Sequence, residues 1–261
     1  MIGLIVAMRR EAQPLLRLAG PSRGGTIAGL ESRCFTLHGA PCILVYCGIG
    51  MERARAAAAA FIRAVSPSLL VSFGISGSVE EDLQVGDVVV AERSLLHGGD
   101  APPQQLLAAT PEELAAVERA VAEQGASTFR GSVVTTRGES VHSRDAAGLP
   151  HPVLDMETWA IAQEAARQDV PLLSVRGLSD SVREPLPFDL TQMTDAGGSF
   201  RAGRLLWQAA CHPGMLRRLS RLQANTRRAE ENVTAAVVTL LSFRGSRTPQ
   251  IPQAPHATPG T

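Results

Sequence analysis

Short apolar runs alternate along this chain with segments in which apolar residues recur at helical spacing. Six runs have the length and composition of buried β-strands: residues 2–7, 42–47, 69–73, 87–91, 132–135 and 172–175. Four segments have the helical period: residues 11–18, 51–65, 111–124 and 157–168. A β-hairpin is also indicated over residues 25–37. This alternation predicts an α/β fold of three layers (α/β/α), with a mainly parallel, twisted central sheet covered by helices on both faces.

Beyond Phe200 the pattern changes, and arginine-rich amphipathic segments predict two or three further helices. The leucines can share one stripe while the arginines crowd the other side; these residues are Leu205, Leu206, Leu216, Leu219, Leu222, Arg217, Arg218, Arg221, Arg227 and Arg228. Such helices serve either as a cap or dimer surface, or as a peripheral contact with an anionic membrane. We therefore expect a catalytic domain over residues 1–190, a C-terminal helical extension over 191–245 and a disordered, Pro/Gln/Thr-rich tail over 246–261.

Composition narrows the classes of function. The net charge of zero argues against nucleic acid as a partner, and no apolar stretch is long enough to span a bilayer. Cys34, Cys42, Cys47 and Cys211 form no Cys-x-x-Cys pair and no cluster with histidine at ligand spacing, which favours reduced thiols and no metal site. Every basic residue is arginine, which excludes a Walker-type phosphate loop and a Schiff-base lysine. The expectation is a cytoplasmic enzyme without metal or cofactor.

Three acidic residues follow predicted strands. Glu11 lies in the first turn of the helix after strand 2–7. Glu157 begins the helix at 157–168, where a buried apolar strand that includes Val153 and Leu154 turns into that helix. Asp180 comes shortly after strand 172–175. Ligands of open α/β sheets bind at strand ends, so these carboxylates are candidates for chemistry. The structural alternative is that Glu11 and Glu157 only complement helix dipoles and Asp180 is an ordinary loop residue.

Six short motifs occur in unbroken order from Met1 to about Phe188: Ala-Met-x-x-Glu at 7–11, Gly-Ile-Gly-x-x-x-Ala at 48–54, a Gly-rich turn at 73–77, Val-Gly-Asp-Val-Val-Val at 85–90, Asp-Met-Glu at 155–157 and Arg-x-x-Ser-Asp at 176–180. Together they resemble the purine nucleoside phosphorylase and methylthioadenosine/S-adenosylhomocysteine nucleosidase superfamily. The resemblance implies cleavage of a purine N-glycosidic bond, and a homodimer in which a neighbouring subunit completes the pocket.

The resemblance also implies roles for individual residues. Asp180 would protonate the purine at N7, Glu157 would accept hydrogen bonds from the ribose 2′- and 3′-hydroxyls, and Glu11 would position and deprotonate the attacking water. Other positions would orient the acid or bind the substrate. Arg176 and Ser179 would orient the acid loop, and Met156, Ile49, Gly50, Gly74 and Phe188 would contact the nucleoside.

Two departures from the family pattern bear on the reaction. Phosphorylases commonly carry an Arg before the Gly-rich turn and a Ser or Thr after its first glycine, whereas this chain has Ser72 and Ile75. Losing two charge-assisted contacts to phosphate favours hydrolysis. Phosphorolysis stays open as an alternative through Arg9, Arg10, Arg137 or Ser76.

The second departure is the C-terminal segment, where a His-Pro turn and a Leu-Arg-rich helix are similar to the hopanoid-associated branch of the superfamily. Members of that branch remove adenine from adenosylhopane, so the resemblance implies an adenine nucleosidase acting on a lipid-linked adenosine in hopanoid biosynthesis, peripheral to the inner membrane. The alternatives are a methylthioadenosine/S-adenosylhomocysteine nucleosidase, a purine nucleoside phosphorylase, or a non-catalytic nucleoside-binding or membrane-surface module.

Overall fold

The computed structural model describes residues 1–139, 141–184 and 213–245. Phe188, Leu205, Leu206 and the tail over 246–261 lie outside these ranges. The strands are β1 (Ile2–Val6), β2 (Arg23–Ile27), β3 (Leu30–Leu37), β4 (Ala40–Tyr46), β5 (Leu69–Ser78), β6 (Val88–Leu96), β7 (Gln104–Gln105), β8 (Thr128–Thr135), β9 (Pro152–Asp155) and β10 (Leu172–Asp180). The helices are α1 (Arg9–Ala19), α2 (Met51–Val65), α3 (Pro111–Ala122), α4 (Thr158–Arg167) and α7 (Pro213–Gly245), with a 3₁₀ turn at Ser143–Ala146.

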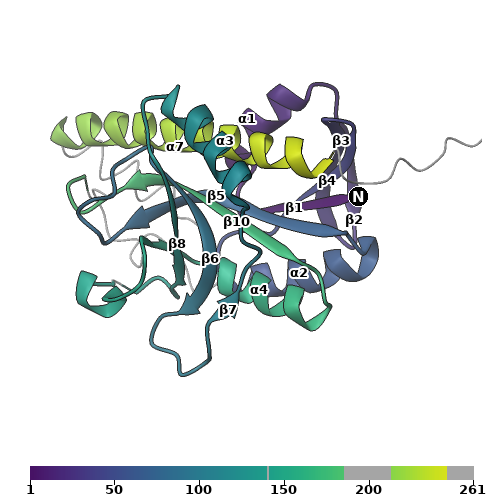
Figure 1. Cartoon of the computed structure of the whole chain (residues 1–261), viewed down its shortest axis with the longest axis horizontal. Helices are drawn as coiled ribbons and strands as arrows, with labels where there is room; N and C mark the ends of the chain where they lie inside the picture. The colour runs from purple at the N-terminus through teal and green to yellow at the C-terminus, as the bar shows by residue number, and fades with distance from the viewer. Residues whose placement is uncertain (140, 185–212, 246–261) are drawn as a thin grey trace, which may run out of the picture.

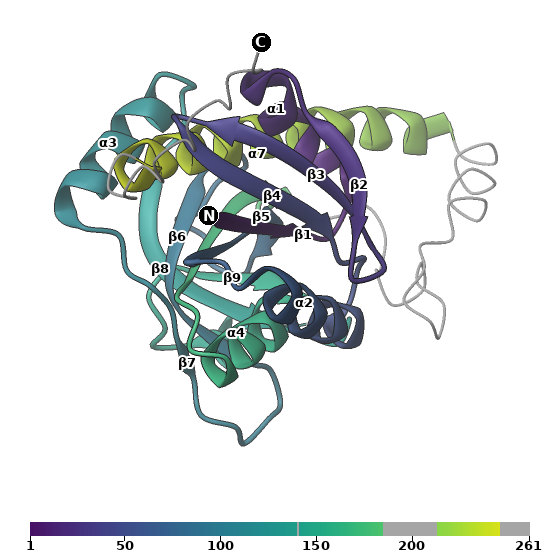
Figure 2. The ribbon, with the colours of Figure 1, turned by 90° about the vertical axis from the view of Figure 1, so that its right-hand side faces the viewer.

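The expected three-layer α/β/α arrangement is confirmed. Helices α1, α3 and α7 cover one face of the sheet, and α2 and α4 lie side by side on the other (Figures 1 and 2). All six predicted strands and all four predicted helices are present, and the predicted hairpin is β2–β3. The short strand β7 was not predicted, because two glutamines in a polar loop carry no alternation of apolar and polar positions.

The sheet is more mixed than the alternation of strands and helices predicted. Parallel pairing joins β1 to β4 and β5, β10 to β5, and β8 to β6 and β9, while the other five described pairings are antiparallel. Strand β5 pairs with β1, β9 and β10, so that β5, β10, β6, β8 and β9 close into a ring. Strand β5 is therefore shared by this ring and by the open part of the sheet.

Side chains on β5 alternate between two hydrophobic cores. Val71 and Phe73 belong to the core under α1, α3 and α7, whereas Leu70 belongs to the core under α2 and α4. This is the period of two that a strand buried on both faces imposes. The middle of the sheet is thus fixed from both sides, which holds the ends of its strands in place.

Helix α7 is one continuous helix of 33 residues, and the part of the expected helices before Pro213 lies outside the described residues. Its second half crosses β10 and β5. In this half, fully buried side chains belong to the core under α1, α3 and α7; they are Val233, Ala236, Val237 and Leu240. This segment was expected to be a C-terminal extension, and between Ala229 and Leu241 its buried side chains are part of the core. Small residues at this contact let the helix approach the sheet closely. None of the helices in the described ranges is long and apolar enough to cross a membrane.

Helix α7 approaches the sheet closely at Gly177 of β10. A Cβ atom at this position would collide with the backbone carbonyl oxygen of Ala229 and would lie 3.2 Å from the Cβ of Val233. Because a backbone atom cannot rotate away as a side chain can, the helix itself would have to move.

We expect Gly177→Ala to lower the free energy of unfolding by about 1–3 kcal/mol, the usual cost of overpacking a core. Urea denaturation followed by circular dichroism would measure this change. The matched control is Gly25→Ala on the exposed strand β2, where the added Cβ would be 3.5 Å from the Ser32 hydroxyl oxygen in ordinary contact. Equal denaturation midpoints for the two variants would show that α7 does not pack as described.

Candidate active site

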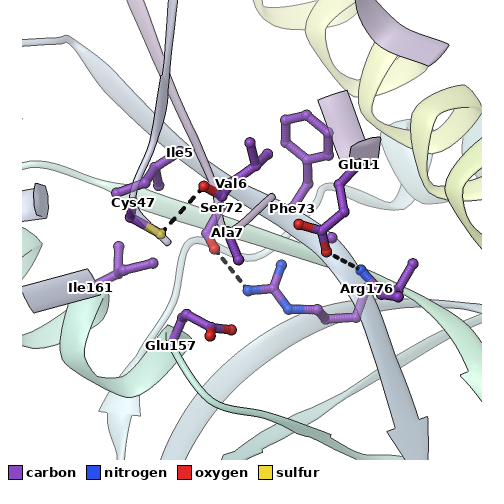
Figure 3. Close-up of a pocket in the computed structure, with 12 residues that line it drawn as sticks. Ile5, Val6, Ala7, Glu11, Cys47, Ser72, Phe73, Glu157, Ile161 and Arg176 are labelled. Carbon is purple, nitrogen blue, oxygen red and sulfur yellow. Dashed lines mark hydrogen bonds between the residues drawn. The ribbon is translucent and has the colours of Figure 1, made fainter. Parts of the chain in front are cut away.

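Four strands contribute to a small polar pocket, β1 and β9 at their carboxyl ends and β5 and β10 at their middle (Figure 3). Strand β1 leads into α1 and Glu11, β5 contributes Ser72 to Ile75, β9 leads to Glu157, and β10 carries Arg176. The pocket is lined by Ile5, Val6, Ala7, Glu11, Cys47, Ser72, Phe73, Gly74, Ile75, Glu157, Ile161 and Arg176. Its free space is enough for about one water molecule. The structure therefore brings Glu11, Glu157, Arg176 and Gly74 of the expected site together.

Glu11 is buried and held by backbone groups on both sides of its carboxylate. Oε2 accepts a hydrogen bond from the Met8 N–H at 2.8 Å, and Oε1 accepts one from the Ile75 N–H at 3.0 Å. A Cβ at Gly74 would lie 2.6 Å from Oε1, so the carboxylate fits against β5 only because residue 74 is glycine. Burial raises the pKa of Glu11, and the two backbone hydrogen bonds oppose that rise. Glu11 thus both caps its helix and faces the pocket.

Glu157 immediately precedes α4, and its carboxylate is tied to the turn after β4. Oε1 accepts a hydrogen bond from the Gly50 N–H at 2.7 Å. Gly50 has φ +102°, a conformation that favours glycine. Burial and then the nearby negative charge of Asp155 raise the pKa of Glu157 to about 8. Gly50 was expected to contact the nucleoside; here its N–H donates a hydrogen bond to a carboxylate of the protein.

Asp180 is the last residue of β10 and lies against β5. After an irregularity between Leu178 and Asp180, it pairs in register with Gly77, and a Cβ at Gly77 would collide with its carboxylate. The Ser179 hydroxyl donates a hydrogen bond to Asp180 Oδ1 at 2.8 Å. Burial raises the pKa of Asp180, and the bond from Ser179 opposes the rise. Two glycines of one strand therefore give space to two of the three acids.

Arg176 does not have the expected position beside the acid loop. Its Nη2 donates to the Ser72 hydroxyl at 2.8 Å, and Nε and Nη2 donate to Asp155 Oδ2 at 3.3 and 3.0 Å. Within the described part of the chain its hydrogen bonds go to β5, β9, α4 and its own strand, and none reaches Asp180. Asp155, the partner of this buried ion pair, was given no role from sequence. Its position two residues before Glu157 was the available signal.

The remaining expected residues are placed as follows. Met156 and Ile49 are partly buried, the first between β9 and α4 and the second in the turn before α2, and neither lines the small pocket. Arg9 and Arg10, alternatives for gripping phosphate, form ion pairs with Glu31 and Glu230. The Ser76 hydroxyl is buried and has no hydrogen-bond partner among the described residues. Those residues also include no group of three or more His, Cys, Asp or Glu side chains placed to hold a metal ion.

The chain is similar to known proteins over most of its length. The family model described as the phosphorylase superfamily matches residues 1–210. The 5'-methylthioadenosine/S-adenosylhomocysteine nucleosidase of Shewanella pealeana is 28% identical over 218 residues, which cover 77% of this chain and 95% of that protein. The nucleosidase of the same description from Haemophilus influenzae is 28% identical over 197 residues, covering 69% and 85%.

Solved structures share the fold. The 5'-methylthioadenosine/S-adenosylhomocysteine nucleosidase of Neisseria meningitidis, in complex with methylthio-immucillin-A, superposes with a TM-score of 0.68 at 20% identity and covers 93% of this chain and 98% of its own. The futalosine hydrolase of Helicobacter pylori superposes with a TM-score of 0.66 at 16% identity, covering 93% and 97%.

Because the pKa of Glu157 is raised in the folded protein, we expect the free energy of unfolding to depend on pH through this group. A carboxyl whose folded-state pKa is raised stabilises the fold fully below its unfolded-state pKa, and this contribution is lost as pH rises through about 8. Glu157→Gln keeps an oxygen for the Gly50 N–H but does not titrate. Relative to this variant, the free energy of unfolding of the wild type should fall by up to about 4 kcal/mol between about pH 5 and about pH 8, measured with urea.

The control for this measurement is Glu52→Gln, an exposed acid in the first turn of α2. Its stability should follow the pH dependence of the wild type. Stability curves of Glu157→Gln and wild type that run parallel from acid to alkaline pH would contradict a raised pKa.

Proposed function

The chain belongs to the phosphorylase superfamily, and we propose that it is a purine nucleosidase that hydrolyses the N-glycosidic bond of an adenine nucleoside. The observation that supports this most directly is the placement of three carboxyl groups along β5: Glu11 and Glu157 line the pocket beside it, and Asp180 lies opposite Gly77 further along the strand. The nucleosidase relatives, which match most of the chain, support the same reaction class.

Breaking the bond leaves negative charge on the departing purine, which a proton donor stabilises. Asp180 has this role in the proposal, protonating the base at N7. A carboxyl group must keep its proton near neutral pH to act as an acid, and burial shifts the pKa of Asp180 in that direction. The hydrogen bond from Ser179 fixes which way the Asp180 carboxyl faces.

The sugar becomes positively charged as the bond breaks, and carboxylates stabilise it. Glu157 accepts hydrogen bonds from the ribose 2′- and 3′-hydroxyls in the proposal. Such bonds favour the ionised carboxylate and so lower its pKa when substrate binds. Glu11 holds and deprotonates the attacking water, because it lines the pocket that has space for about one water molecule.

Water is favoured over phosphate as the nucleophile by the groups present. The Ser72 hydroxyl is bound by Arg176, and residue 75 is isoleucine, whose backbone N–H is bound by Glu11. Arg9 and Arg10 are paired with glutamates. A phosphate dianion would lack the charge-assisted contacts that are each worth about 1.5–3 kcal/mol.

For the 5′ substituent we propose a lipid, with conversion of adenosylhopane to ribosylhopane and adenine by a cytoplasmic homodimer that contacts the inner membrane peripherally. The arginine-rich sequence from Phe200 to Ala229 supports this substrate. The burial of α7 from Ala229 onward limits the support, because that part of the segment packs on the sheet. The second candidate is a methylthioadenosine/S-adenosylhomocysteine nucleosidase, which the relatives favour.

The substrate test uses purified full-length protein with adenosine, methylthioadenosine, S-adenosylhomocysteine and an adenosyl-lipid in vesicles containing anionic lipid. Free adenine measured by chromatography should appear at a rate independent of added phosphate, with a free sugar hydroxyl as co-product. Adenine from methylthioadenosine but not from the adenosyl-lipid would select the second candidate. A ribose-1-phosphate product in phosphorus NMR would instead identify a phosphorylase.

Asp180→Asn tests the general acid. Asparagine keeps the shape and accepts the Ser179 hydrogen bond, but it cannot donate the proton, so kcat should fall by about 10²–10⁴-fold while the melting temperature stays close to that of the wild type. Asp169→Asn, an exposed turn residue after α4, serves as the control for the same chemical change. Turnover of Asp180→Asn within a factor of two of the wild type would remove Asp180 from the mechanism.

A further inference from the structure

Asp155 is the most completely hydrogen-bonded carboxylate beside the pocket. Oδ1 accepts from the Thr135 hydroxyl at 2.7 Å. Oδ2 accepts from the Thr158 N–H at 3.0 Å, from the Thr158 hydroxyl, and from Nε and Nη2 of Arg176. The side chains of Asp155 and Arg176 are 2% and 4% exposed, so the pair is out of water.

These bonds determine what the Arg176 guanidinium does in the pocket. Arg176 lines the same pocket as Glu11 and Glu157 and lies between them in the view of Figure 3. Its donors nevertheless point to Asp155, Ser72 and Thr158. Among the described contacts, the hydrogen bonds that Glu11 and Glu157 accept come from backbone N–H groups and none from a cation.

We propose that Asp155 is a positioning residue for the proposed hydrolysis: by holding Arg176, it prevents a direct ion pair with Glu157 or Glu11 and leaves both carboxylates available to substrate and water. The inference rests on the proposed function for its activity readout only. An arginine released from Asp155 would find two carboxyl groups in the same pocket, and a charge-assisted bond to either would compete with the ribose hydroxyls or the water.

Asp155 also holds the start of α4, where Glu157 lies. The Thr135 hydroxyl that donates to Asp155 accepts a hydrogen bond from the Trp159 N–H at 2.9 Å. Together with the Thr158 bonds, this connects the ends of β8 and β9 to the first turn of α4. The direction in which Glu157 faces therefore depends on the Asp155 carboxylate.

The charged and titratable groups that face Glu157 come from several neighbouring elements. They are Asp155 after β9, Glu11 on α1 and Arg176 on β10, with the Cys47 thiol after β4, whose pKa burial raises. Asp155 raises the pKa of Glu157 and Arg176 lowers it. Removing the negative charge of Asp155 takes away a repulsion on the Glu157 carboxylate. It also leaves the positive charge of Arg176 without its counterion, and both effects lower the pKa of Glu157.

The test compares wild type with Asp155→Asn, and uses Ser72→Ala as the matched control because it removes one hydrogen bond to Arg176 without changing any charge. Carbon-13 NMR with labelled glutamate should show the Glu157 titration moved to lower pH by about 1–3 units in Asp155→Asn, and moved much less in Ser72→Ala. In Asp155→Asn, the rising limb of kcat/KM against pH should move to lower pH together with the Glu157 titration. The plateau of kcat/KM should fall about 10²-fold, because Glu157 is no longer held in position.

The outcomes separate this inference from the proposed function. A shifted titration in a protein that releases no adenine from any nucleoside would refute the function and leave the positioning role. Adenine release by the wild type, with an unshifted titration and limb in Asp155→Asn, would overturn the positioning role alone.

A second variant covers the case in which Asp155→Asn does not fold because an arginine is left buried without its counterion. Thr135→Val keeps the charge of Asp155 but removes the hydroxyl that orients it. The proposal requires a fall in its kcat/KM with the pH limb unchanged. A lower melting temperature with wild-type kcat/KM would show that the network is only structural and would overturn the proposal.

Discussion

Carboxyl groups taken out of water are stable as anions only where hydrogen bonds or opposite charges replace their hydration. This requirement shapes the centre of the molecule. Glu11 and Glu157 depend on backbone N–H groups from β5 and from the turn after β4, and Asp180 depends on its neighbour Ser179. Among the described contacts of these four acids, Asp155 is the one that has a buried arginine as partner. Burial raises the pKa values of Glu11, Glu157 and Asp180, and these are the acids to which the proposal gives chemical roles.

The fold was largely accessible from the sequence because alternation and helical period survive burial. The three layers, the strands β1, β4, β5, β6, β8 and β10 and the four central helices followed from that pattern. The pairing of β5 with β9, which is antiparallel, and with β10, which is parallel, did not follow, because pairing between strands far apart in the sequence leaves no periodic mark. The burial of α7 from Ala229 onward was not predicted, because the prediction for this segment rested on the arginines at its beginning.

The candidate site was accessible only in part. Glu11, Glu157 and Asp180 could be placed near strand ends because each comes within a few residues of a predicted apolar strand. The partner of Arg176 could not be found in this way, since the pair Asp155–Arg176 depends on two strands approaching across β5 rather than on spacing along the chain. The importance of Gly74 and Gly77 also required coordinates: each glycine leaves room for a carboxylate from another element.

The burial of α7 has a consequence for how the protein is made. The apolar face of β5 and β10 is covered only when residues 229–241 have been synthesised, although both strands are complete by Asp180. Chains fold from the N-terminus as they are produced, at about 5–20 residues per second. For several seconds the nascent polypeptide therefore presents an uncovered sheet, a state in which chaperone binding competes with aggregation.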